Sequence, residues 1–313
     1  MTQARAGRGK ALRKQVARHM PFYFMMLPGI AYLLINNYLP LAGLQLAFKK
    51  FKYNEGIWGS SFNKFKNFTF LFKSPDTPVF IRNTIGYNLV FIVLGTVFAI
   101  LVAILLNEVR RKNLQQTYQT IILIPHLISY VIVSYIAYAF LGQDNGMINN
   151  GILKPLGMEP LAWYTQPIYW YYIIVLIHLW KSFGYNSIIY YATIVGIDRT
   201  YYEAATVDGA GTWTQITKIT LPLLKPTVIT LTLLAIGRIF YSDFALFYQV
   251  PMNSGLLYDA TNTIDTYVYR GLMESNDIGR ASAAGFIQSI MGFVLVLSSN
   301  AIVRKIDREQ ALF

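Results

Sequence analysis

The chain has 313 residues, of which 54% are hydrophobic and 13% are charged, and its formal net charge is +12. A soluble domain normally carries about a quarter charged residues, so this composition indicates a protein built for lipid. The absence of cysteine excludes disulfides and thiol nucleophiles, and His19, His126 and His178 stand too far apart to suggest a zinc or haem site.

The first 19 residues form a basic tail without an acidic side chain. Its cations are Arg5, Arg8, Lys10, Arg13, Lys14 and Arg18. Such a tail can bind nucleic acid, but beside apolar segments it more simply indicates anionic lipid headgroups and the positive-inside rule. We therefore expect residues 1–19 to be a cytoplasmic tail, with membrane lipid as a partner and no nucleic acid.

Six apolar segments are long enough to cross the hydrocarbon core of a bilayer, which takes about 20 helical residues. They are residues 20–48, 81–108, 118–141, 167–194, 218–250 and 281–304. Each must be helical because lipid offers the backbone no hydrogen-bond partners, and Pro28, Pro40 and Pro125 predict kinks. The sequence predicts an all-α membrane protein with six transmembrane helices in one domain, residues 20–304.

Residues 195–217 form a polar, helix-forming island between two apolar segments. Asp198 can accept hydrogen bonds at the start of a short helix, and Gly209 and Gly211 permit a sharp turn. Pro222 suits the first turn of the helix that follows. The pattern predicts a helix–turn–helix at a membrane face, a unit that can transmit force but carries no catalytic group.

This island holds a specific arrangement: Glu203-Ala204-Ala205, a glycine at 209 after three intervening residues, and Ile219-Thr220-Leu221-Pro222 about ten residues later. It resembles the EAA loop of the permease subunits of binding-protein-dependent ABC importers. The resemblance implies the type I ABC importer permease fold, with a cytoplasmic coupling loop at 195–217 that docks on an ATPase. The coupling residues that it implies are Tyr202, Glu203, Ala204, Ala205, Asp208, Gly209, Ala210, Leu221 and Pro222.

Six spans leave both termini on one side, and an ATPase-docking loop at 195–217 requires that side to be cytoplasmic. The Arg110-Arg111-Lys112 turn and the C-terminal tail 305–313 then also lie inside, and residues 49–80 and 250–280 form external loops. Lysines in the first external loop argue against this orientation. The island outweighs them, and we expect both termini to be cytoplasmic.

Shorter motifs resemble the carbohydrate-uptake class, the relatives of the maltose and glycerol-phosphate permeases, and most closely the permeases for complex oligosaccharides such as alginate and pectin fragments. They are Leu27-Pro28-Gly29, residues 105–110 (LLNEVR), Ile124-Pro125, Gly196-Ile197-Asp198 and residues 263–270 (TIDTYVYR). The resemblance implies a bacterial cytoplasmic (inner) membrane complex with a second homologous permease subunit, two copies of a cytoplasmic ABC ATPase, an extracytoplasmic solute-binding protein and an oligosaccharide substrate. It implies no cofactor in this chain, because the ATPase binds ATP and magnesium.

Motifs of enzymes are missing from the sequence, which contains no phosphate-binding loop, no Gly-x-Ser-x-Gly and no His-Glu-x-x-His. We therefore expect a non-catalytic conduit whose energy comes from an ion gradient or from a partner ATPase. Asp243 is the one clear acid in the spans, whereas an ion-coupled carrier usually has more. The ATP-driven importer is favoured; an ion-coupled secondary sugar transporter is the alternative, and a scaffold protein a third.

Arg238 stands midway along the predicted fifth span, where a charge needs water or a partner. It could contact sugar hydroxyls or a carboxylate, or pair with another helix. Lysines of the first external loop also suit acidic, uronate-containing substrates. The substrate-pathway candidates are Asn88, Tyr135, Tyr185, Asn186, Arg238 and Tyr241, although tyrosines also gather at membrane interfaces.

Other polar residues in the spans are expected to be structural. His178 and Lys181 should make contacts between helices, and His126 should bind carbonyls that the Pro125 kink sets free.

Overall fold

The computed structural model describes residues 19–306, with side chains to residue 305. The predicted tails therefore lie almost wholly outside the described residues. The α-helices after the first one are α2 Gly56–Gly59, α3 Lys66–Lys73, α4 Asp76–Glu108, α5 Lys112–Leu127, α6 Tyr130–Leu141, α7 Pro167–Val195, α8 Arg199–Val207, α9 Thr212–Gln215, α10 Leu221–Gly237, α11 Phe244–Gln249, α12 Tyr258–Thr261, α13 Ile264–Met273 and α14 Ile278–Ile306. A two-stranded antiparallel hairpin joins β1 Lys49–Lys50 to β2 Ser61–Phe62.

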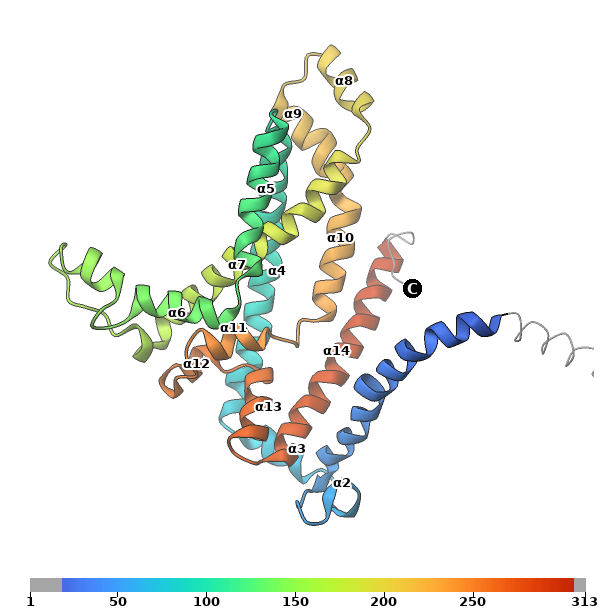
Figure 1. Cartoon of the computed structure of the whole chain (residues 1–313), viewed down its shortest axis with the longest axis vertical. Coiled ribbons are helices and arrows are strands. Elements are labelled where there is room, and N and C mark those ends of the chain that lie inside the picture. Colours follow the sequence, from blue (N-terminus) through green and yellow to red (C-terminus); the bar gives the residue numbers. More distant parts are fainter. Residues whose placement is uncertain (1–18, 307–313) are drawn as a thin grey trace, which may run out of the picture.

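Shorter 3-10 and π segments complete the chain. They are η1 Leu34–Tyr38, η2 Leu39–Phe48, η3 Asn149–Leu153, η4 Trp163–Thr165, η5 Ile216–Thr220 and η6 Gly255–Leu257. Figure 1 shows α8 and α9 at one end of the molecule and α2, α3 and α13 toward the opposite end, with α4, α5, α7, α10 and α14 running between. The residues predicted as a coupling loop and those predicted as external loops thus lie at opposite ends of the molecule.

The long helices α4 and α7 pack closely because α4 presents small side chains along one face. Ala99 and Ala103 stand four residues apart, and both are fully buried. Tyr190 and Ile194 of α7 belong to the same buried cluster as the two alanines. Small residues let helix backbones approach, which favours association where lipid supplies no hydrophobic driving force.

Among the described residues, four helices could each cross a membrane by length and composition: His19–Phe48, Asp76–Glu108, Thr212–Gly237 and Ile278–Lys305. A fifth span is possible if the bent pair α5 and α6 counts as one. The 29-residue α7 is long enough, but its many polar aromatic residues leave it below the hydropathy of the other four. Residues 19–306 thus contain four candidate spans, or five with the bent pair, against the six predicted segments.

The predicted third span, 118–141, is wrong as a single helix. Its two parts, α5 and α6, meet at an angle of 91°. Ile128 and Ser129 between them have extended backbone, and the Ser129 side chain caps α6 by accepting from the Ile132 N–H. The break between the two helices thus begins at Ile128, three residues after Pro125, and the helix that follows the break, α6, starts with its own cap, Ser129.

The prediction for His126 is also wrong. Its ring stacks on Tyr185 of α7 at 4.7 Å between centroids. The carbonyls at the end of α5 instead accept hydrogen bonds from the buried Lys181 ammonium. Lys181 and His178 do make contacts between helices, as expected.

The predicted fifth span, 218–250, is interrupted. One continuous helix runs over Thr212–Gly237, residues 238–243 are non-helical, and α11 follows. Arg238 is consequently the C-terminal cap of α10 and does not lie within a helix. The second helix of the predicted coupling loop is joined to this span without a break.

The first helix, His19–Phe48, stands largely apart from the rest of the chain (Figure 1), and none of its most apolar window is buried. Only its outer part, η2, packs against α14. The helix changes from α to π and then 3-10 geometry beside Pro40, which occupies the first turn of η2. Proline cannot donate the N–H that an α-helix needs there, so a change of helix type is expected.

Candidate functional site

The predicted helix–turn–helix is formed by α8, a turn and α9. The Asp198 side chain accepts from the Thr200 N–H at 2.9 Å and caps α8, as predicted. This backbone hydrogen bond lowers the pKa of Asp198, because it favours the charged carboxylate.

The end of α8 explains the spacing between the alanines and the glycine. Gly209 has a φ of +78°, the Ala210 N–H donates to the Ala205 carbonyl at 2.8 Å, and the Gly209 N–H donates to Thr206 at 3.0 Å. This is a Schellman motif, in which the residue with positive φ is usually glycine. Gly211, in contrast, has a φ of −71° that any residue adopts, so only one of the two predicted glycines is needed for the turn.

Side-chain hydrogen bonds tie α8 to the start of the following helix. The Tyr202 and Thr220 hydroxyls lie 2.9 Å apart, and the Gln215 amide donates to the Thr206 hydroxyl at 3.0 Å. Tyr202 therefore points toward the protein. The predicted Leu221 and Pro222 follow in the first turn of α10.

The exposed surface of the α8–α9 unit carries three large apolar side chains. Tyr201, Trp213 and Val207 are 57%, 76% and 87% exposed. Val207 was not predicted from the sequence, although its position four residues after Glu203 places both on one face of α8. Ala204 and Asp208 are also exposed, and Ala205 and Ala210 are half-buried.

Glu203 is exposed and forms no ion pair with any residue of the described part of the chain. It lines a cavity of about 980 Å³ between α8, the C-terminal end of α7 and the turn from α4 to α5. Arg110 and Arg199 also line this cavity. The carboxylate is thus free to meet a group from outside the chain.

A second cavity, of about 570 Å³, lies among α4, α7, α10 and the non-helical segment 238–243. Four of the six predicted pathway residues line it: Asn88, Asn186, Arg238 and Tyr241. Tyr135 is 67% exposed on α6, and Tyr185 is stacked on His126, so neither belongs to this cavity.

Asn88 supports the cavity wall through the backbone. Its amide donates to the Ile239 carbonyl at 2.9 Å and to the Tyr241 carbonyl at 3.1 Å. Gln288 of α14 donates to the Phe240 carbonyl at 2.8 Å. Irregular backbone at membrane depth is tolerated where protein groups satisfy it and it borders a cavity, and these two amides do so for three successive carbonyls.

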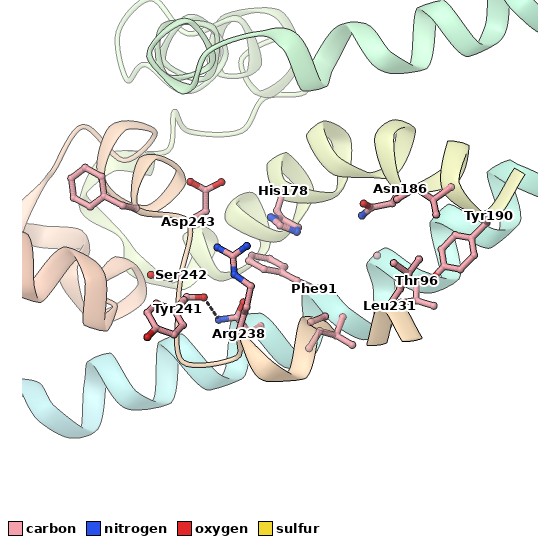
Figure 2. Close-up of a pocket in the computed structure, with 16 residues that line it drawn as sticks. Phe91, Thr96, His178, Asn186, Tyr190, Leu231, Arg238, Tyr241, Ser242 and Asp243 are labelled. Atoms are coloured by element: carbon pink, nitrogen blue, oxygen red, sulfur yellow. Dashed lines mark hydrogen bonds between the residues drawn. The ribbon is translucent and has the colours of Figure 1, made fainter. Parts of the chain in front are cut away.

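Charged and aromatic groups meet at one end of this cavity. Figure 2 shows the Arg238 guanidinium directed toward the space between Asp243, His178 and Phe91. The His178 ring is stacked on Phe91 at 3.6 Å between centroids, and Asp243 caps α11 by accepting from the Leu246 N–H at 3.4 Å. Arg238 has no ion pair within the described residues, so its donors can meet an oxygen-rich ligand.

Metal binding has no support in the described part of the chain, where no three His, Asp or Glu side chains gather in a way that could hold an ion.

Comparison with known proteins identifies the family. Residues 95–311 match the family described as "Binding-protein-dependent transport system inner membrane component". The chain belongs to this family. The permease is 32% identical to Protein LplB of Bacillus subtilis (strain 168) over 304 residues, which are 97% of this chain and 95% of that protein.

Two further relatives carry more specific names. The polygalacturonan/rhamnogalacturonan transport system permease protein YteP of Bacillus subtilis (strain 168) is 32% identical over 96% of this chain and 92% of its own. A chain of a bacterial ABC transporter involved in the import of the acidic polysaccharide alginate superimposes with a TM-score of 0.85 at 34% identity, covering 95% of this permease and 99% of that chain.

The resemblance seen in the sequence is confirmed. The protein is a multi-pass, non-catalytic inner-membrane permease of a binding-protein-dependent ABC importer, and no cofactor is expected in this family. The family description makes it a component of a binding-protein-dependent transport system. A chain of a bacterial alginate ABC transporter in complex with an alginate pentasaccharide-bound periplasmic protein superimposes with a TM-score of 0.84 at 34% identity, covering 94% of this permease and 97% of that chain.

Proposed function

We propose that this permease is one half of an ATP-driven importer of oligosaccharides, and that the α8–α9 unit couples closure of an ATPase pair to alternating access. One observation carries the proposal. Helix α7 and the helix Thr212–Gly237 both line the cavity of about 570 Å³, called the central cavity from here on, and the α8–α9 unit connects the C-terminal end of α7 to the N-terminal end of the helix Thr212–Gly237. A displacement of α8 and α9 is thereby passed along a continuous helix to Arg238 at the cavity. Rigid-body movement of such packed helices is a common form of conformational switch.

The unpaired Glu203 and the exposed apolar side chains of Tyr201, Val207 and Trp213 support the docking role. Apolar contact area beside one anion suits a groove with a basic residue. Two such permeases side by side would engage two copies of the ATPase. The apolar surface of the first helix, His19–Phe48, is not covered by the rest of the described chain. This supports a second, homologous permease subunit as its neighbour.

Six spans and cytoplasmic termini complete the proposed topology. The bent pair α5–α6 and the tyrosine-rich α7 would join the four long apolar helices as membrane-crossing elements. The α8–α9 unit, the turn after α4 and both ends of the chain would then be cytoplasmic, as the positive-inside rule favours for Arg110, Arg111 and Lys112.

Acidic, uronate-containing oligosaccharides are the substrates that the cavity suits best. Arg238 has free donors, and the guanidinium binds carboxylates in a bidentate geometry. Asn186 and Tyr241 add polar groups to the wall, and Asn88 holds its backbone. Relatives named for polygalacturonan and alginate transport support the same substrate class.

The complete transporter, reconstituted in vesicles with its partner permease, ATPase and binding protein, tests this function. Uptake of acidic oligosaccharides should need internal ATP, survive collapse of ion gradients, and exceed uptake of neutral oligosaccharides of equal length, most strongly at low salt. Uptake driven by an ion gradient without ATP would establish the ion-coupled alternative, which membership of this family does not support. Equal uptake of neutral and acidic sugars at low salt would remove the acidic preference.

A further inference from the structure

The carboxylate of Asp265 connects helix α13 to the wall of the cavity of about 570 Å³. Asp265, in the first turn of α13, accepts from the Ser242 backbone N–H at 2.6 Å and from the Ser242 hydroxyl at 2.8 Å. Its other oxygen accepts from the Gln288 amide at 3.1 Å. Ser242 lies in the non-helical segment 238–243, so a residue of the predicted external loop fixes part of the central cavity.

The backbone of segment 238–243 is not helical, so side chains from other segments must satisfy its hydrogen-bonding groups. Asn88 and Gln288 satisfy the carbonyls of residues 239–241, and Asp265 satisfies the N–H of Ser242. Asn88 and Gln288 lie in the long helices α4 and α14. Asp265 is the one member of this group that carries a charge, and hydrogen bonds to an ionised acceptor are about twice as strong as neutral ones.

The start of α13 is itself rigidly held. The Thr266 hydroxyl accepts from the Thr263 N–H at 2.9 Å in a capping box, and the Ile264 N–H donates to the Thr84 hydroxyl of α4 at 3.0 Å. The Thr263 and Ser242 hydroxyl oxygens also lie 2.7 Å apart. The backbone that carries Asp265 is therefore held in place at the first turn of α13.

We propose that Asp265 is the positioning residue through which the outer loop sets the shape of the cavity wall: its contact with Ser242 holds segment 238–243, and with it Arg238 and Tyr241, in place. A partner that displaces α13 from outside thereby changes the cavity. That consequence rests on the proposed function, whereas the positioning of the segment does not.

This chain has no cysteine, so one introduced cysteine gives a label unique within it, which is read on this subunit after the subunits are separated by electrophoresis. In the assembled complex, Tyr241→Cys is labelled with N-ethylmaleimide in three backgrounds: the parent, Asp265→Asn and Asp259→Asn. Asp259→Asn is the matched control, because it also replaces an aspartate by asparagine in the predicted external loop 250–280. Asp259 bonds to Arg82 and Tyr171 and not to segment 238–243. Asp265→Asn should label about tenfold faster, the effect of losing one hydrogen bond to a charged group, and Asp259→Asn should label at the parent rate.

Ser242→Ala is a milder second variant, since it removes the hydroxyl and keeps the N–H. It should label about threefold faster, and combining it with Asp265→Asn should add little, because the two side chains act through one contact. An unchanged or slower rate in Asp265→Asn, with or without a loss of thermal stability, would overturn the proposal. If Asp265→Asn does not assemble, Ser242→Ala decides, and an unchanged rate there overturns it.

Uptake by the reconstituted transporter gives the second readout. Asp265→Asn should lower it about tenfold while Asp259→Asn stays near the parent. Faster labelling with normal uptake would retain the positioning role and reject its importance for transport. An importer that takes up no sugar at all would refute the proposed function and leave the labelling result standing.

Discussion

The ammonium nitrogen of Lys181 lies 2.9 Å from the carbonyl oxygen of Pro125, across the contact between α7 and α5. The same nitrogen donates to the carbonyls of His126 and Ile128 and lies 4.6 Å from the centre of the Tyr130 ring. One buried lysine therefore occupies the end of α5 and contacts the start of α6. A cation at a helix C-terminus is favourable because carbonyls there lack partners within the helix.

Replacing Lys181 by methionine should destabilise the permease. The carbonyls of Pro125, His126 and Ile128 would lose their donor, at a cost of about 1–3 kcal/mol for a buried acceptor left unsatisfied. Thermal unfolding of the purified protein in detergent measures the loss. Lys181→Arg keeps donors in place and should recover part of it; equal stability of Lys181→Met and the parent would show that the lysine does not hold the bend.

Gly184 of α7 should tolerate no side chain. A Cβ there would lie 1.8 Å from the Ile122 carbonyl oxygen of α5, so alanine would force the two helix backbones apart. We expect Gly184→Ala to lower the yield of folded protein in size-exclusion chromatography. Gly285→Ala is the control, because a Cβ at that helical glycine meets nothing within 4 Å. Equal yields of the two variants would contradict the close approach of α5 and α7.

Asp198 should stabilise α8 in a pH-dependent way. Its pKa is lower in the folded protein because the Thr200 N–H donates to it, so the stabilisation is present above the usual aspartate pKa and is lost as the pH falls through the lowered value. Hydrogen exchange of residues 199–207 in Asp198→Ala should be faster than in the parent at neutral pH, and the two should converge in acid. Asp198→Asn, which still caps a helix, should resemble the parent at neutral pH.

Glu203→Ala and Gly209→Pro should each abolish uptake while the permease stays in the membrane in normal amounts. The first removes the free anion of the α8–α9 unit; the second cannot adopt the φ of +78° found at Gly209. Uptake into vesicles and immunoblotting of the membrane fraction check both points. Glu159→Ala, at an exposed acid far from this unit, should transport normally. Full accumulation by Glu203→Ala would remove the docking role of that carboxylate.

Arg238→Gln should reduce uptake of acidic oligosaccharides by about tenfold or more, the effect of losing a hydrogen bond to a charged group. Uptake of neutral sugars should change less, because glutamine can still bind hydroxyls. Arg280→Gln, which alters an arginine paired with Asp277 outside the cavity, is the matched control. An equal loss for both kinds of sugar would assign Arg238 a structural role.

The helix–turn–helix could be predicted from the sequence almost completely. A capping aspartate, a glycine at the left-handed position and a proline in the next first turn are local signals, because each acts on backbone groups within a few residues. Local hydrogen bonds decide the shape of this unit, and Asp198 and Gly209 have the roles that their types suggest. An all-helical membrane protein could likewise be predicted from the long apolar stretches.

Pro125 marked a kink in the sequence, but the tertiary structure alone decided that α10 ends at Gly237 and how far the chain bends after Pro125. Nothing near Gly237 in the sequence shows that α10 ends there, because the groups that stabilise the open segment, on Asn88, Asp265 and Gln288, come from distant parts of the chain. The bend after Pro125 likewise depends on Lys181, 56 residues further on. In lipid a helix can open only where other helices satisfy its backbone, so these positions are set by packing between segments and not by any one of them.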